Sequence, residues 1–119
     1  MKILVIDDDA AVRTVIGKTL TTGLHTVLEA DNGKTGLRLL EEHRDISVMI
    51  TDLIMPEKDG IETILEVRTK YPAIRILAIS GGGVVGADKY LALAKALGAH
   101  AILKKPFSGR ELMQAIEKL

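Results

Sequence analysis

The chain has 119 residues, which is enough for one compact domain and too short for two, and 47% of the residues are apolar. Lysine and arginine together number 16, as do aspartate and glutamate, and this neutral balance argues against nucleic acid as the main partner. The absence of cysteine excludes disulfides and cysteine-bound zinc. Because no apolar run is long enough for membrane insertion or a signal peptide, we expect a cytoplasmic protein.

The first half of the chain alternates short apolar runs with segments of helical periodicity. Lys2–Ile6 (KILVI) is continuous and rich in β-branched residues, which is typical of a strand buried on both faces. Asp9 is expected to cap a helix that ends at Gly23, with an apolar face of Val12, Val15, Ile16 and Leu20. The next predicted elements are a strand at Thr26–Glu29, a turn at Asp31–Gly33, a helix through Leu37 and Leu40, and a strand at Ser47–Thr51.

The second half continues this alternation. A loop (DLIMPEKDG) runs from Asp52 to Gly60, with Pro56 as a turn residue. The next predicted elements are a helix using Ile61, Ile64, Leu65 and Arg68, a strand at Arg75–Ile79, a flexible loop at Gly81–Gly83 and Gly86, and a helix at Asp88–Leu97 ending at Gly98. A strand at Ala101–Leu103 then precedes a helix that Ser108 and Glu111 begin as a capping box and that runs through Leu119.

Five strand–helix units in regular order predict an α/β fold. The sheet is expected to be doubly wound, five-stranded and parallel, with helices on both faces, because strand–helix–strand crossovers are right-handed. We expect the flavodoxin-like strand order 2-1-3-4-5, which makes strands one and three neighbours and leaves strand two at the edge. The prediction is a single domain over residues 1–119 with no output domain.

Polar residues gather where the predicted strands end. Asp7 and Asp8 follow the first strand, Asp52 the third, Ser80 the fourth and Lys105 the fifth. Because ligands of open parallel sheets bind at the carboxyl ends of the strands, we expect these side chains to lie together. Carboxylates at such short range repel each other unless a cation joins them. Mg²⁺ suits the site better than Ca²⁺, which prefers more protein ligands.

Asp52 is interpreted as the acceptor of a phosphoryl group. A carboxylate can act as the nucleophile that forms an aspartyl phosphate, and it needs no general base because it is ionised at neutral pH. Mg²⁺, the Lys105 ammonium and the Ser80 hydroxyl would neutralise the phosphoryl oxygens. Each residue alone has a structural explanation, as a loop acid, a solvated lysine or a turn hydroxyl. Their joint occurrence at one edge of the sheet favours a functional site.

The motifs match those of a known family. The chain resembles the receiver domains of bacterial two-component response regulators, and the resemblance covers essentially its whole length. The matching motifs are VIDDD at Val5–Asp9, MITDLIMPEKDG at Met49–Gly60, LAIS at Leu77–Ser80 and KPF at Lys105–Phe107.

The resemblance implies a role for each matching residue. Asp52 would be the phosphoacceptor, Asp8 a direct Mg²⁺ ligand, Asp7 the second acid, and the Ile54 carbonyl a backbone ligand of the metal. Ser80 would follow the phosphoryl group on activation. Lys105 corresponds to the family's lysine, and its bond to Pro106 is expected to be cis.

The resemblance also implies partners. The donor would be a phosphohistidine on a sensor histidine kinase or a histidine phosphotransfer protein, and acetyl phosphate could substitute for it. The chain would then be a signalling domain that changes conformation, and not an enzyme, although it could promote its own phosphorylation and dephosphorylation. The signal would pass through Ser80, Ile102 and Pro106 to a downstream protein or a second copy of the chain. The expected output surface consists of Tyr90, Leu91, Lys95, Ile102, Lys104 and Glu111.

Two features depart from the family pattern. Ile102 stands where the family usually has an aromatic switch residue, and the stretch from Ser80 to Lys105 is longer than in common receivers. Our hypothesis is that phosphorylation orders the glycine-rich loop in place of moving an aromatic ring.

Other functions fit part of the pattern. In a phosphatase of the haloacid dehalogenase type, Asp7 would be the nucleophile within Asp7–Asp9, and Asp52 would have no role. A binding module that never turns over phosphate is a second alternative, and FMN binding rests on the fold alone.

Overall fold

The computed structural model describes residues 1–55, 59–81 and 87–119. The predicted turn at Pro56 and most of the glycine-rich loop, including Gly82, Gly83 and Gly86, lie outside these ranges. The strands are β1 (Lys2–Ile6), β2 (Thr26–Ala30), β3 (Ile46–Asp52), β4 (Arg75–Ser80) and β5 (Ala101–Lys104). The helices are α1 (Ala10–Thr22), α2 (Gly33–Glu42), α3 (Gly60–Lys70), α4 (Ala87–Leu97) and α5 (Gly109–Glu117).

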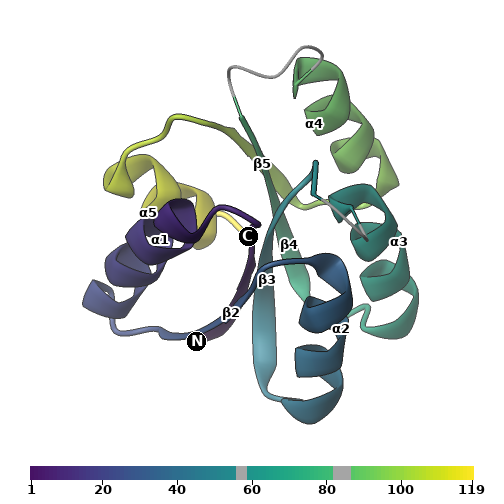
Figure 1. Ribbon diagram of the computed structural model, residues 1–119, viewed down its shortest axis with the longest axis horizontal. Helices are drawn as coiled ribbons and strands as arrows, with labels where there is room; N and C mark the ends of the chain where they lie inside the picture. Colours follow the sequence, from purple (N-terminus) through teal and green to yellow (C-terminus); the bar gives the residue numbers. More distant parts are fainter. Residues whose placement is uncertain (56–58, 82–86) are drawn as a thin grey trace.

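The strands form one parallel sheet in the order β2-β1-β3-β4-β5, which confirms the predicted fold class. Figure 1 shows α1 and α5 on one face of the sheet and α2, α3 and α4 on the other. Strand β1 therefore lies between β2 and β3 in the interior of the sheet. None of the described helices is long and apolar enough to cross a membrane.

Burial on both faces follows from the alternation of side chains along the strands. In β1, Leu4 and Ile6 belong to the core under α2, α3 and α4, whereas Ile3 and Val5 belong to the core under α1 and α5. All four side chains are fully buried. A continuous apolar run is the pattern that this position requires, which explains why β1 was predictable at its exact bounds.

Side-chain caps fix where the helices begin. Asp9 accepts hydrogen bonds from the Ala11 and Val12 amides, and Ser108 and Glu111 form the predicted capping box. The predicted turn at Asp31–Gly33 is wrong in part, because the Asn32 side chain caps α2 and Gly33 is its first residue. Asparagine is preferred both in turns and at N-caps, so the local pattern did not separate the two.

Three further details differ from the predictions. Helix α5 ends at Glu117 rather than Leu119, with Lys118 as its C-cap. Val15 is 62% exposed and Leu65 is 46% exposed, although both were assigned to apolar faces. In α1 the buried stripe consists of Ile16 and Leu20, which are four positions apart, and Val15 falls beside that stripe.

Candidate functional site

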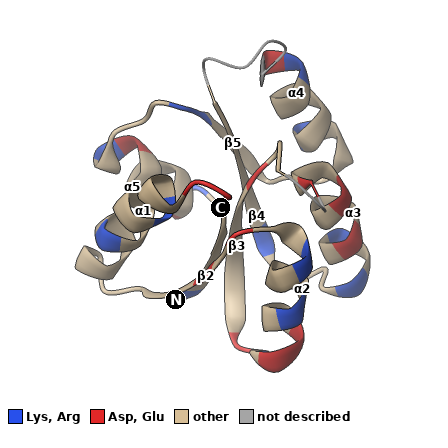
Figure 2. Cartoon of the chain, in the orientation of Figure 1, with Lys and Arg blue, Asp and Glu red and all other residues tan. Residues whose placement is uncertain are grey.

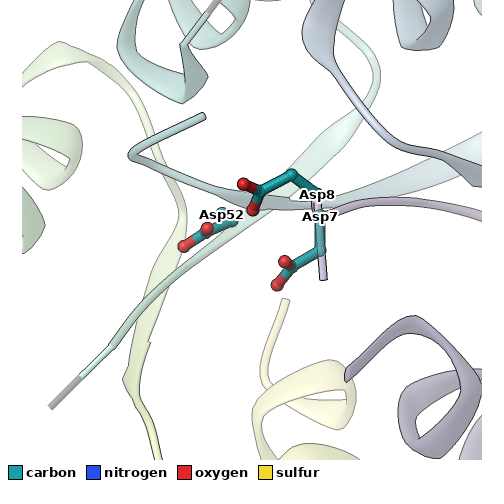
Figure 3. A group of neighbouring side chains, drawn as sticks. All are labelled: Asp7, Asp8 and Asp52. Carbon is teal, nitrogen blue, oxygen red and sulfur yellow. The ribbon is translucent and has the colours of Figure 1, made fainter. Parts of the chain in front are cut away.

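Strand order brings the acids together. The register of β1 and β3 pairs Ile6 with Thr51, so Asp7 follows β1 next to Asp52, the last residue of β3. Figure 2 shows the segments that carry these acids in red. Carboxylate oxygens of Asp7, Asp8 and Asp52 all lie within 4.8 Å of one another (Figure 3). The structure therefore assembles the three acids that were predicted to meet.

Asp7 is buried and held from two sides. One of its carboxylate oxygens accepts a hydrogen bond from the Asp9 amide at 2.9 Å, and the other lies 2.7 Å from the Lys105 ammonium. Its own amide donates to the Ala30 carbonyl on β2 at 3.1 Å. Asp8, in contrast, is exposed, so the two neighbouring acids have different surroundings.

Asp52 is only 7% exposed, and its surroundings disfavour the ionised form of its carboxyl group. Burial and the neighbouring Asp7 carboxylate raise the pKa of Asp52 to about 6, against the opposing effect of the Lys105 ammonium, which lies 3.6 Å away. Asp52 is therefore still mostly ionised at neutral pH, as expected, but its pKa lies much closer to neutrality than that of an ordinary aspartate. A cation bound between the carboxylates would stabilise the ionised form.

Glycine allows α3 to begin against the end of β3. A Cβ atom on Gly60 would collide with the Asp52 carbonyl oxygen and lie 2.7 Å from the Leu53 Cα. The Gly60 amide donates to the Leu53 carbonyl at 3.0 Å, which closes the Asp52 loop onto the helix. The close approach requires a residue without a side chain at this position.

Ser80 and Lys105 complete the same edge of the sheet. Ser80 pairs with Lys104 across β4 and β5, and the Lys105 amide donates to the Ser80 carbonyl at 2.7 Å. The peptide bond between Lys105 and Pro106 is cis, as expected. The Ser80 hydroxyl is buried and has no hydrogen-bond partner among the described residues. A buried polar atom without a partner calls for an explanation, and a bound anion is one.

These residues surround one cavity. Its volume is about 290 Å³, and its lining residues are Asp7, Asp8, Asp9, Asp52, Ile54, Ser80, Gly81 and Lys105. The three carboxylates and the raised pKa of Asp52 fit a divalent cation, whereas the ammonium and the unpartnered hydroxyl fit an anion beside it. The cavity can therefore hold a metal ion and a phosphoryl group side by side.

The structure gives the exposure of residues on the expected output surface, whose role stays a prediction. Ile102 and Tyr90 are each 40% exposed, and the Lys104 ammonium pairs with Asp88 of α4 at 3.0 Å. Leu91 is only 4% exposed, so its assignment to this surface is wrong. Helix α4 directs Leu91 into the core together with Ala94, and its position on the helix could not be fixed before the packing of α4 was known.

The sequence interpretation missed Arg13. Its guanidinium donates to the Asp7 carbonyl at 2.6 Å and pairs with Glu29 of β2 at 3.3 Å. The only available signal was a basic residue in the first turn of α1, and this is too common on helix surfaces to be informative.

Comparisons with known proteins identify the family of the chain. The model of the family described as the response regulator receiver domain matches residues 3–117. The chain belongs to this family. Receiver domains act as phosphoacceptors in two-component signalling. Membership in the family selects the receiver interpretation over the phosphatase and FMN-binding alternatives.

Several named proteins are similar to this chain over almost its whole length. A chemotaxis protein CheY homolog from Campylobacter jejuni is 37% identical over 120 residues, covering 98% of this chain and 90% of the relative. The transcriptional regulatory protein CpxR from Klebsiella pneumoniae is 34% identical, covering 99% of this chain and 48% of the relative. The crystal structure of a receiver domain protein from Clostridium thermocellum superposes with a TM-score of 0.87 at 33% identity, covering 98% of this chain and 90% of that one.

Proposed function

We propose that Asp52 accepts a phosphoryl group from a phosphohistidine on a sensor histidine kinase or a histidine phosphotransfer protein. The observation that carries this proposal is the position of Asp52, which lines a cavity with two further acids, a lysine and an unpartnered hydroxyl. Acetyl phosphate is proposed to serve as a small donor.

Mg²⁺ is the proposed cofactor. Asp7, Asp8, Asp52 and the Ile54 carbonyl would hold it, and Ile54 lines the cavity beside the three acids. When bound, Mg²⁺ would neutralise negative charge on the carboxylates and on the phosphoryl oxygens. The oxygen-only donor set is the kind that Mg²⁺ prefers.

The chain's own residues supply the rest of the transfer. A carboxylate oxygen of Asp52 forms the new P–O bond as the P–N bond of the phosphohistidine breaks, and the electron pair of that bond stays on the imidazole nitrogen. The Lys105 ammonium, which lies between Asp7 and Asp52, can turn toward a phosphoryl oxygen. The Ser80 hydroxyl can donate a hydrogen bond to another oxygen.

The readout of the phosphoryl group is proposed to start at Ser80. Ser80 and Lys104 are paired across β4 and β5. A shift of Ser80 would therefore displace β5, which carries Ile102 and precedes Pro106. The output is a downstream protein or a second copy of the chain. We further propose that the same site promotes its own dephosphorylation and that the protein works in the cytoplasm.

Phosphorylation mapping tests the proposal. The protein is treated with acetyl phosphate and Mg²⁺, and intact-mass measurement followed by peptide mapping locates the phosphoryl group. We expect one phosphoryl group on Asp52, and none in Asp52→Asn or when EDTA removes the metal. Asp31→Asn, which changes an exposed acid after β2, is the matched control and should be labelled like the wild type. A label on Asp7 would refute the proposal.

A kinase panel then tests the donor. Phosphotransfer from candidate histidine kinases to the wild type should be fast for one of them and absent for Asp52→Ala. Equal, slow labelling by every kinase would contradict a dedicated phosphohistidine donor.

A further inference from the structure

Arg13 of α1 contacts the residue that follows β1 and a residue of β2. It lies in the first turn of α1, where its own amide donates to the Asp9 carbonyl. Its side chain reaches back, so that Nη1 donates to the Asp7 carbonyl at 2.6 Å and Nε pairs with Glu29 Oε1 at 3.3 Å. The Arg13 side chain is 19% exposed, and its contact with the Asp7 carbonyl is partly buried, whereas the contact with the 46% exposed Glu29 side chain lies at the surface. Helix α1, the end of β1 and β2 are thereby joined through one guanidinium.

The carbonyl that Arg13 binds belongs to the peptide that leads into Asp8. The Asp7 carboxylate is already held by Lys105 and by the Asp9 amide. The Asp8 side chain is exposed, so the orientation of its carboxylate depends mainly on the peptide that carries it. A group that fixes the Asp7–Asp8 peptide therefore acts more on Asp8 than on Asp7.

We propose that Arg13 is a positioning residue for the cation site. Its guanidinium holds the Asp7–Asp8 peptide so that the Asp8 carboxylate faces Asp52, and Glu29 anchors the guanidinium. This inference rests on the proposed function, in which Asp7, Asp8 and Asp52 hold Mg²⁺. Groups that orient a metal ligand without touching the metal change metal affinity by roughly 10- to 100-fold when they are removed.

The geometry requires arginine rather than lysine. The planar guanidinium presents several donors in a fixed fork, so Nη1 and Nε can bind two oxygens on different elements at once. A lysine at this position has a single ammonium at the end of a flexible chain, and it cannot reproduce both contacts with the same rigidity. Arg13→Lys is therefore expected to keep only part of the wild-type metal affinity.

Metal binding by the 119-residue chain tests the inference without any phosphoryl donor. The dissociation constant for Mg²⁺ is measured by titration calorimetry for the wild type, Arg13→Met, Arg13→Lys, Glu29→Gln and Arg38→Met. Arg38 is an exposed arginine on α2, so Arg38→Met controls for the loss of one positive charge. We expect binding about tenfold weaker in Arg13→Met, with intermediate values for Arg13→Lys and Glu29→Gln and no change in Arg38→Met.

A second readout separates positioning from general stability. Saturating Mg²⁺ should bring the rate of phosphorylation by acetyl phosphate in Arg13→Met back toward the wild-type rate, because the acceptor itself is intact. A dissociation constant for folded Arg13→Met within about twofold of Arg38→Met would overturn the inference. If Arg13→Met does not fold, Glu29→Gln decides, and unchanged Mg²⁺ affinity in that variant overturns the inference equally.

The same measurements distinguish this inference from the proposed function. A wild-type protein that does not bind Mg²⁺, or is labelled elsewhere than on Asp52, refutes the proposed function. A wild type that binds Mg²⁺ and is labelled on Asp52, together with unaltered affinity in Arg13→Met, refutes only the role of Arg13.

Discussion

At each end of the sheet, burial and nearby like charges shift the pKa of one ionisable side chain, upward for an acid at the carboxyl end and downward for a base at the amino end. At the carboxyl end, burial and a like charge on Asp7 raise the pKa of Asp52 to about 6. At the amino end, burial and the like charges of Arg75, Arg68 and Lys95 lower the pKa of His100. Both ends therefore hold an ionisable group in a setting that disfavours its charged form.

The two ends differ in whether the chain satisfies its own polar groups. At the amino end, Lys95 donates to the His100 carbonyl at 3.2 Å, Arg68 donates to the Pro72 carbonyl at 3.3 Å, and the Ile76 amide donates to His100 Nδ1 at 3.0 Å. At the carboxyl end, three carboxylates crowd together and the Ser80 hydroxyl has no partner among the described residues. The crowded carboxylates and the unpartnered hydroxyl lie at the end that is proposed to bind ligands, whereas the polar groups at the amino end are paired within the protein.

The largest expected effect tests the ion pair at the carboxyl end. Lys105→Met leaves the fully buried Asp7 carboxylate without its cation, and we expect the free energy of unfolding to fall by about 3 kcal/mol. Urea denaturation monitored by circular dichroism measures the change.

Lys104→Met is the matched control for this variant. Lys104 and Asp88 form an exposed pair, so its loss should change the free energy of unfolding by about 0.5 kcal/mol or less. Equal losses in the two variants would mean that the buried pair contributes no more than the exposed one, and the contrast between the ends would fail.

The second largest effect is an increase in stability, which we expect when Asp52 is replaced by a neutral residue. Its pKa is raised in the folded state, so the native protein binds the proton more tightly than the unfolded chain does. The resulting stability is fully present below pH 3.8 and is lost as the pH rises through about 6. With EDTA present, Asp52→Asn should therefore be more stable than the wild type at pH 7, by about 1 to 2 kcal/mol after allowing for solvent screening.

Denaturation across the pH range measures the Asp52 effect. The advantage of Asp52→Asn should shrink as the pH falls from 7 to 4, and Mg²⁺ should reduce it at pH 7 by stabilising the wild type. Asp31→Asn serves again as the control. An advantage that does not depend on pH would refute the electrostatic explanation.

His100 gives the smallest effect and tests the amino end. His100→Ala leaves the Ile76 amide without its acceptor, and we expect a loss of about 1 kcal/mol at pH 7. His100→Asn offers an oxygen near the position of Nδ1 and should retain most of this stability.

The pH dependence sharpens the same test. Because the pKa of His100 is lowered in the folded state, the unfolded chain binds the proton more tightly, and stability is lost as the pH falls below the ordinary value of 6.5. Wild-type stability should therefore decline between pH 7 and pH 5 more steeply than that of His100→Asn, with His25→Asn as the reference for losing an imidazole. Parallel curves for the wild type and His100→Asn would contradict this explanation.

Much of the fold was predictable because it depends on short-range patterns. The bounds of β1 were predicted without error, and the other predicted strands are each confirmed with one added residue at one or both ends. The capping box at Ser108 and Glu111 was also predictable, because both residues act on the same turn. Where two local signals overlapped, as at Asn32, the prediction was wrong, since a turn and an N-cap favour the same residue.

The sequence by itself determined the set of chemical groups and their place at the strand ends. Asp7, Asp8, Asp52, Ser80 and Lys105 each follow or end a strand that is recognisable from its apolar pattern, and parallel order then brings them to one edge. The family motifs added the roles that these residues are proposed to have.

Only the tertiary structure decided how these groups are paired. Lys105 lies closer to Asp7, at 2.7 Å, than to Asp52, at 3.6 Å, although Asp7 is 98 positions away in the sequence. Likewise, Arg13 reaches the Asp7 carbonyl and Leu91 turns into the core because of how α1 and α4 pack on the sheet. Such contacts depend on the rotation of each helix and on distances between strands, which the periodicity of a local segment does not specify.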